Sequence, residues 1–131
     1  MEDLKSRMKD NLILQKSYDF SLRIIKLYKF LCENKKEYVL SKQLLRAGTS
    51  IGANVNEAQV GMSRKDFVAK MSIASKEARE TRYWLDLLVD SGYISKTDNK
   101  VKNLFEEIES IISILTKIVK TGASNEKESN I

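Results

Sequence analysis

The fold is decided by residues 101–119, VKNLFEEIESIISILTKIV, where apolar residues recur every three or four positions. This spacing places them on one face of an α-helix, in the seam pattern of helices that pack side by side. We expect this helix to begin near Thr97 or Asp98 and to end at Gly122. The predicted seam consists of Val101, Leu104, Phe105, Ile108, Ile111, Ile112, Leu115, Ile118 and Val119.

Another helix is predicted immediately before this one in the chain. Ser63 is followed three residues later by Asp66, which is close to the capping-box pattern of a helix start. Ser91 and Gly92 are expected to end this helix, because glycine readily adopts the left-handed conformation of a helix cap. Its predicted core stripe consists of Phe67, Met71, Ala74, Ala78, Leu85 and Leu88.

A further helix is expected over residues 41–60, although Gly48 and Gly52 each cost about 1 kcal/mol relative to alanine in a helix. Tertiary packing must offset this cost, and such small residues let another backbone approach closely. The predicted core stripe consists of Leu44, Gly48, Ile51, Val55, Ala58 and Met62.

The first helix is predicted over residues 12–33 and carries two sets of apolar residues, so we expect it to touch two neighbours. One set is Leu14, Tyr18, Leu22, Ile25 and Tyr28, and the other is Phe20, Ile24, Leu27 and Leu31.

Short connections between four helices favour antiparallel neighbours. The sequence therefore predicts an all-α, single-domain, up-down-up-down four-helix bundle over residues 12–122. The chain has no proline, which permits long helices. Residues 1–11 are expected to be a flexible N-terminus, and residues 123–131 a disordered tail.

The composition argues against catalysis, a metal site or a cofactor. Histidine is absent and Cys32 is the only cysteine, so the usual general base and the usual zinc ligands are missing. Cys32 is expected to pack as a small hydrophobic residue, and only Glu57 with Arg46 can be imagined as an active site. No apolar run approaches the ~20 residues that cross a membrane, and the charged N-terminus has no signal-peptide core. We therefore expect a cytoplasmic, non-enzymatic protein.

The net charge of +5 suits a protein that binds nucleic acid, although charge alone fits a solvated surface equally well. Seven basic residues of the first helix, its loop and the start of the next helix are the candidates for phosphate binding. They are Lys16, Arg23, Lys26, Lys29, Lys35, Lys36 and Lys42.

Two further stripes leave alternatives open. On the helix at 41–60, the stripe is either a polar seam or solvated flank, or else a subunit interface or ligand contact; it consists of Gln43, Arg46, Ser50, Asn54 and Glu57. On the helix after Ser63, the stripe is either a partly buried rim or a subunit interface, and its carboxylates are candidates to pair with arginines; it consists of Ile73, Glu77, Glu80, Trp84 and Leu87.

Residues 46–58, RAGTSIGANVNEA, and residues 63–88, SRKDFVAKMSIASKEARETRYWLDLL, resemble the four-helix-bundle family of the 23S rRNA intervening sequence protein. Many members have glycine where this chain has Ala58. The resemblance implies an antiparallel four-helix bundle that assembles into a ring, usually a homopentamer, with no established catalytic activity. The motif residues are Arg46, Ser50, Ile51, Asn54, Glu57, Ser63, Phe67 and Ala74.

Related accessory proteins of diversity-generating retroelements form pentameric barrels that bind nucleic acid and a reverse transcriptase. The first hypothesis is therefore a homo-oligomer that contacts RNA or DNA, with RNA favoured, through its basic residues. The alternative is a structural adaptor for a protein partner, such as a reverse transcriptase or another enzyme encoded by the same element.

Overall fold

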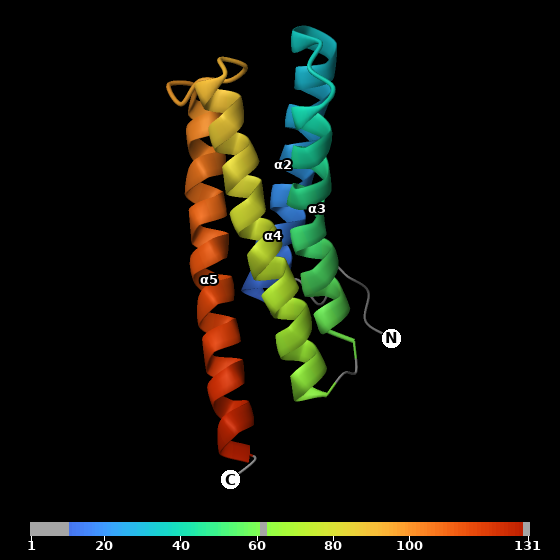
Figure 1. Cartoon of the computed structure of the whole chain (residues 1–131), viewed down its shortest axis with the longest axis vertical. Coiled ribbons are helices and arrows are strands. Elements are labelled where there is room, and N and C mark those ends of the chain that lie inside the picture. Colours follow the sequence, from blue (N-terminus) through green and yellow to red (C-terminus); the bar gives the residue numbers. More distant parts are fainter. Residues whose placement is uncertain (1–10, 61–62, 130–131) are drawn as a thin grey trace.

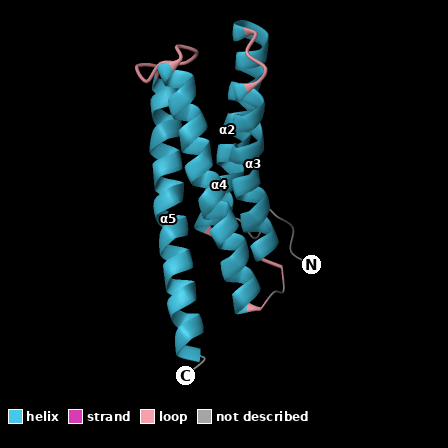
Figure 2. Ribbon diagram, in the orientation of Figure 1, coloured by secondary structure: helices cyan, strands magenta, loops and turns pink. Residues whose placement is uncertain are grey.

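The structure is a computed structural model that describes residues 11–60 and 63–129. This part of the chain forms four helices and no strand (Figures 1 and 2), which confirms the predicted all-α fold. Residues 1–10, which hold nearly all of the predicted flexible N-terminus, and Met62 lie outside the described residues. The helices are α2 (Leu12–Lys35), α3 (Leu40–Ala58), α4 (Arg64–Asp90) and α5 (Asn99–Ser129).

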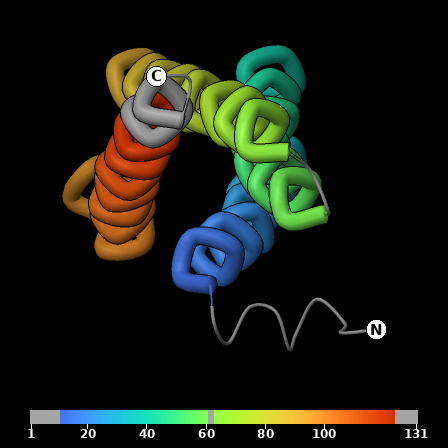
Figure 3. The backbone as a smooth tube through the Cα atoms, turned by 90° about the horizontal axis from the view of Figure 1, so that it is seen from below, coloured from blue at the N-terminus to red at the C-terminus, as the bar shows by residue number. Residues whose placement is uncertain are grey.

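The helices run alternately up and down and form one bundle (Figure 1). α3 packs against α2 and α4, and α5 packs against α4 and, over a smaller contact, against α2. Within the described residues, the diagonal pairs α2 with α4 and α3 with α5 are not in contact. Figure 3 shows the same order around the bundle when it is seen along the helices. The predicted antiparallel four-helix bundle is confirmed.

Side-chain caps explain where three of the helices begin. Asn11 precedes α2, and its side-chain oxygen accepts a hydrogen bond from the amide three residues later at 3.2 Å. Ser63 does the same for α4 at 3.2 Å, which confirms the predicted start of that helix. Asp98 precedes α5 and accepts from the amides two and three residues later at 2.8 and 3.3 Å. Each cap satisfies amides that have no partner inside the helix.

The start of α3 depends on Glu37, which the sequence did not predict. Its buried carboxylate accepts hydrogen bonds from the amides of Val39, Leu40 and Ser41 at 3.1, 2.9 and 2.7 Å. Burial raises the pKa of this carboxyl, but the three amide bonds outweigh it and hold the pKa below its usual range. Lys36, with φ of 54°, forms the left-handed cap of α2 just before it.

The core is formed by large side chains of all four helices, and the predicted stripes of α3, α4 and α5 supply most of it. The prediction that α2 touches two neighbours is confirmed, because α2 packs against α3 and α5. Its two apolar sets are not equally buried: Leu14 of the first set is 1% exposed, whereas Tyr18 and Leu22 of the same set are 41% and 47% exposed. The largest fully buried side chains are Phe20, Leu14, Ile24, Leu31, Leu44, Ile51, Met71, Leu85, Leu88, Ile108, Ile111 and Leu115.

The glycines of α3 mark a close approach to α2, as the sequence predicted. A Cβ atom at Gly48 would lie 2.8 Å from a methyl group of Ile24, and one at Gly52 would lie 3.2 Å from the backbone oxygen of Ser17. Side chains there would push the two helices apart. The close packing of α2 against α3 thus offsets the poor helix propensity of glycine.

The predicted end of the last helix at Gly122 is wrong, since α5 continues to Ser129, into the segment expected to be a disordered tail. Glycine lowers helix propensity by only about 1 kcal/mol, and no proline follows to stop the helix. Gly122 has a packing role instead. A Cβ atom at this position would lie 2.5 Å from a methyl group of Val68 in α4.

Candidate nucleic-acid interface and the Arg46 network

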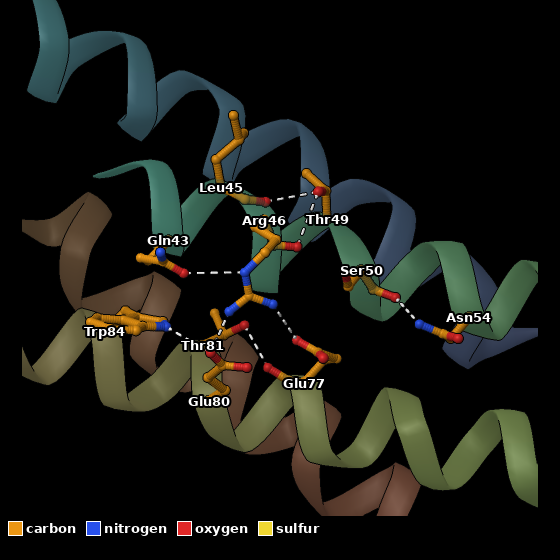
Figure 4. A network of polar contacts seen from close by, with 10 residues as sticks. All are labelled: Gln43, Leu45, Arg46, Thr49, Ser50, Asn54, Glu77, Glu80, Thr81 and Trp84. Atoms are coloured by element: carbon orange, nitrogen blue, oxygen red, sulfur yellow. Dashed lines mark hydrogen bonds and ion pairs between the residues drawn. The ribbon is translucent and has the colours of Figure 1, made fainter. Parts of the chain in front are cut away.

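Arg46 of α3 joins α3 to α4 through its guanidinium group (Figure 4). One terminal nitrogen pairs with Glu77 at 3.3 Å, and the other pairs with Glu80. Its Nε donates to Gln43 at 3.2 Å, and the indole of Trp84 donates to Glu80 at 3.2 Å. The carboxylates predicted to pair with an arginine thus find it within the same chain.

The two carboxylates share one arginine but differ in their environment. Burial, and next the negative charge of Glu80, raise the pKa of Glu77, although Arg46 opposes this rise. Burial also acts to raise the pKa of Glu80, but the hydrogen bonds from Trp84 and Arg46 outweigh it and lower that pKa.

The remaining residues of the α3 stripe do not join this network. The side-chain amide of Asn54 donates to the backbone oxygen of Ser50 at 2.8 Å, within α3 itself. Glu57 forms a separate ion pair with Lys70 of α4 at 3.3 Å. Arg46 and Glu57, imagined together as an active site, thus face different partners along the α3–α4 contact.

The seven predicted phosphate-binding residues separate into two groups. Lys16 pairs with Glu107 of α5 at 3.1 Å and so contributes to the contact of α2 with α5. The other six form no ion pair with any residue that the structure describes. Five of these six are exposed, and Arg23 is half-buried. They are Arg23, Lys26, Lys29, Lys35, Lys36 and Lys42.

Three lysines at the α4–α5 turn were not among the predicted phosphate-binding residues. Lys96, Lys100 and Lys102 are exposed, and they form no ion pair with side chains of residues 11–60 and 63–123. The ammonium group of Lys96 lies 4.6 Å from the centre of the Phe105 ring. The signal was present in the predicted topology, because an up-down-up-down bundle places this turn at the same end as the α2–α3 turn.

An apolar groove of about 420 Å³ lies between α2 and α3. The half-exposed side chains of Tyr18 and Leu22 line it, together with Gly52 and Ala53 of α3. The side-chain oxygen of Asn56 is buried beside the groove and has no hydrogen-bond partner among the described residues.

Cys32 is half-buried between α2 and α3, with its sulfur 3.8 Å from the hydroxyl of Ser41. Among the side chains of residues 11–60 and 63–123, no three of cysteine, aspartate or glutamate gather where they could ligate a metal ion. Nor does any helix there have the length and apolar character needed to span a bilayer.

Comparison with known proteins decides the family. The family model described as 23S rRNA-intervening sequence protein matches residues 9–117, which include α2, α3, α4 and the part of α5 up to Lys117. The chain belongs to the 23S rRNA-intervening sequence protein family. No curated protein matches it significantly.

A solved structure supports the assignment of this chain to the 23S rRNA-intervening sequence protein family. A protein with unknown function from the S23 ribosomal protein family, from Bacteroides thetaiotaomicron VPI-5482, is 46% identical to the chain. The similarity covers 83% of this chain and 99% of that chain, with a TM-score of 0.79. The resemblance noted in the sequence is therefore confirmed, and the bundle is a shared family fold.

Proposed function

We propose that the chain is a non-catalytic, homo-oligomeric bundle that assembles into a pentameric ring and binds nucleic acid, in the first place RNA. The observation that carries this proposal is the exposed basic surface of α2 and the α2–α3 turn. Five of its lysines have no carboxylate partner in the described part of the chain. Lys16 is left out of this surface, because its charge is offset by Glu107.

Lysine ammonium groups bind phosphates without reading bases, so the proposed contact is with the backbone. A ring repeats the same surface on every subunit, and repeated weak contacts raise the overall affinity. The lack of histidine in the sequence supports a binding role over a catalytic one. The five-fold assembly rests on the family resemblance.

The groove between α2 and α3 is the surface that we propose for the contact between subunits. It exposes the apolar side chains of Tyr18 and Leu22, which a partner subunit would cover. A Tyr18→Glu variant should dissociate the oligomer in light scattering while its helix content stays unchanged. The control Asn103→Glu adds the same charge at an exposed position of α5 outside the groove, so it should leave the assembly intact. An intact oligomer in both variants would exclude this groove.

Binding is tested by fluorescence anisotropy with structured RNA at 50 and 200 mM salt. If the bound protein neutralises about three phosphates in total, affinity should fall about 20- to 40-fold over this range, because bound lysines release counterions. A triple variant, Lys26→Glu with Lys29→Glu and Lys36→Glu, should bind much more weakly. If the wild-type protein binds no RNA or DNA even at 50 mM salt, the proposed function is wrong.

A second candidate function is an adaptor for a protein partner such as a reverse transcriptase. It is favoured by exposed apolar side chains on α4, where Ile73 and Tyr83 are 42% and 56% exposed. The test is co-purification with a co-expressed reverse transcriptase or with another enzyme encoded by the same element, before and after nuclease treatment. A complex that survives nuclease and is lost in Ile73→Glu favours the adaptor, and one that dissolves with nuclease favours nucleic-acid binding.

A further inference from the structure

The α2–α3 turn and the α4–α5 turn lie at the same end of the bundle (Figure 1). This follows from the topology, because α2 and α4 run toward this end, and α3 and α5 run away from it. We call this surface the two-turn end and define it as residues 33–42 and 90–102. It holds residues that are far apart in the sequence, so their combined charge is visible only in the folded chain.

The two-turn end carries six lysines and four carboxylates. Two of the carboxylates, Glu37 and Asp98, accept hydrogen bonds from backbone amides at the starts of α3 and α5. Glu33 and Asp90 are the two that remain. All six lysines are exposed and form no ion pair with described residues; they are Lys35, Lys36, Lys42, Lys96, Lys100 and Lys102.

Tyr38 lies within this cluster and has no structural task that the contacts reveal. It is 57% exposed, it does not pack against the core, and its hydroxyl forms no hydrogen bond with the described residues. Tyr93 of the other turn, in contrast, packs against the core. An exposed aromatic ring among lysines combines the two features that bind unpaired strands, a stacking surface and phosphate-binding charges.

The backbone around Tyr38 is already fixed. Glu37 holds the three amides that follow Tyr38, and its backbone oxygen also accepts from the hydroxyl of Ser41 at 2.7 Å. Lys36 is set in the left-handed conformation on the other side. A rigid turn loses little conformational entropy when it binds a ligand, so Tyr38 is presented without a cost of ordering.

We propose that the two-turn end binds single-stranded nucleic acid, with Tyr38 stacking on an unpaired base and the surrounding lysines contacting the phosphates. In a duplex the faces of the bases are covered by their neighbours, so only unpaired bases can reach the ring. This inference rests on the proposed nucleic-acid function and adds the strand state and the contacting residues. Whether the strand is RNA or DNA is an outcome of the test.

The test is anisotropy of the full chain with short single-stranded RNA, the matching single-stranded DNA and the blunt RNA duplex. Tyr38→Ala should weaken single-strand binding about tenfold, because one base loses its stacking partner, and should leave duplex binding unchanged. Tyr38→Phe should bind as the wild type does, because stacking needs the ring and not the hydroxyl. Tyr83→Ala is the matched control, since Tyr83 on α4 is 56% exposed.

Charge reversal tests the contribution of the second turn. Lys100→Glu should weaken single-strand binding several-fold. The control is Lys117→Glu, which should have a smaller effect, because Lys117 is an exposed lysine of α5 near the start of α4, away from the two-turn end. Circular dichroism and light scattering accompany each variant. If Tyr38→Ala dissociates the oligomer, Tyr38 belongs to a subunit contact and the inference is wrong.

The outcomes distinguish this inference from the proposed function. If the wild type binds duplex as tightly as single strands and Tyr38→Ala matches Tyr83→Ala, the inference is overturned while nucleic-acid binding stands. If the wild type binds none of the three probes at low salt, both are overturned. A tenfold loss of affinity that is confined to Tyr38→Ala and to single strands supports the inference. The single-stranded probe that binds more tightly, RNA or DNA, then identifies the ligand.

Discussion

Removing the carboxylate of Glu37 should destabilise the bundle at neutral pH and much less in acid. In Glu37→Ala the amides of Val39 and Leu40 lose acceptors at 3.1 and 2.9 Å, but Val39 is 72% exposed, so water can replace part of this loss. The amide of Ser41, a residue that is fully buried, loses a 2.7 Å bond to a charged oxygen. We expect about 1 kcal/mol from the first two amides together and about 2 kcal/mol from the third.

The Glu37→Gln variant distinguishes the contributions of the two carboxylate oxygens to stability. A glutamine oxygen can keep the bonds to Val39 and Leu40, but the amide nitrogen would then face the amide of Ser41, donor against donor. We therefore expect a loss of about 1–2 kcal/mol for glutamine and about 3 kcal/mol for alanine, or roughly 10 °C in Tm for alanine. Glu33→Gln is the matched control, because Glu33 is exposed, and it should cost under about 0.5 kcal/mol.

The pH dependence follows from the sign of the pKa shift. Because the pKa of Glu37 is lowered below its usual 4.5 in the folded chain, its contribution is present at neutral pH and is lost as the pH falls through the folded pKa. Urea unfolding at about pH 7 and pH 3, at one protein concentration, measures this. The reasoning is refuted if Glu37→Ala loses the same unfolding free energy at both pH values. It is also refuted if Glu37→Gln is as stable as Glu33→Gln.

Three other changes test different parts of the bundle. Gly48→Ala should cost about 1–3 kcal/mol in urea unfolding despite better helix propensity, since the new Cβ meets Ile24; a gain in stability would contradict the close packing of α2 on α3. Arg46→Ala should raise the pKa of Glu77 further, as measured by NMR titration, and an unchanged titration would argue against the shared arginine. The same variant should lose up to about 1 kcal/mol of unfolding free energy at pH 7, and this loss should shrink as Glu77 becomes protonated. Trp84→Ala should weaken the oligomer more than helix content, as light scattering and circular dichroism would measure; loss of both together would assign Trp84 to the core.

The helices and most of the core could be predicted because they follow from local spacing. The seam from Val101 to Leu115 repeats at helical period, and any helix with such a face must bury it. The start of α4 at Ser63 was predictable because a cap is a contact between residues three positions apart. The glycines of α3 could be interpreted correctly, since a costly residue in a helix implies close packing.

Other features depend on contacts that the sequence does not encode locally. The end of α5 was misplaced because Gly122 fits the side chain of Val68, a residue of another helix, where a cap was expected. The two apolar sets of α2 predict two neighbours, but they do not reveal that Tyr18 and Leu22 stay half-exposed, since exposure depends on where α3 and α5 lie.

The candidate site was predicted by residue type better than by partner. The sequence proposed that Glu77 and Glu80 meet an arginine, but only the packing of α3 on α4 identifies Arg46. Lys16 was grouped with the other basic residues, although Glu107 of α5 lies beside it in the fold. Lys96 and its neighbours were missed because the charges of two turns add only when the bundle brings them to one end.

The C-terminal end of α5 lies at the far end of the molecule from the two-turn end (Figure 1). An affinity tag or biotin attached there would hold each protomer on a sensor surface with its lysine-bearing turns facing the solution. Immobilisation in this orientation would leave the proposed strand contacts open to an injected oligonucleotide, whereas random coupling through lysines would consume the same amines.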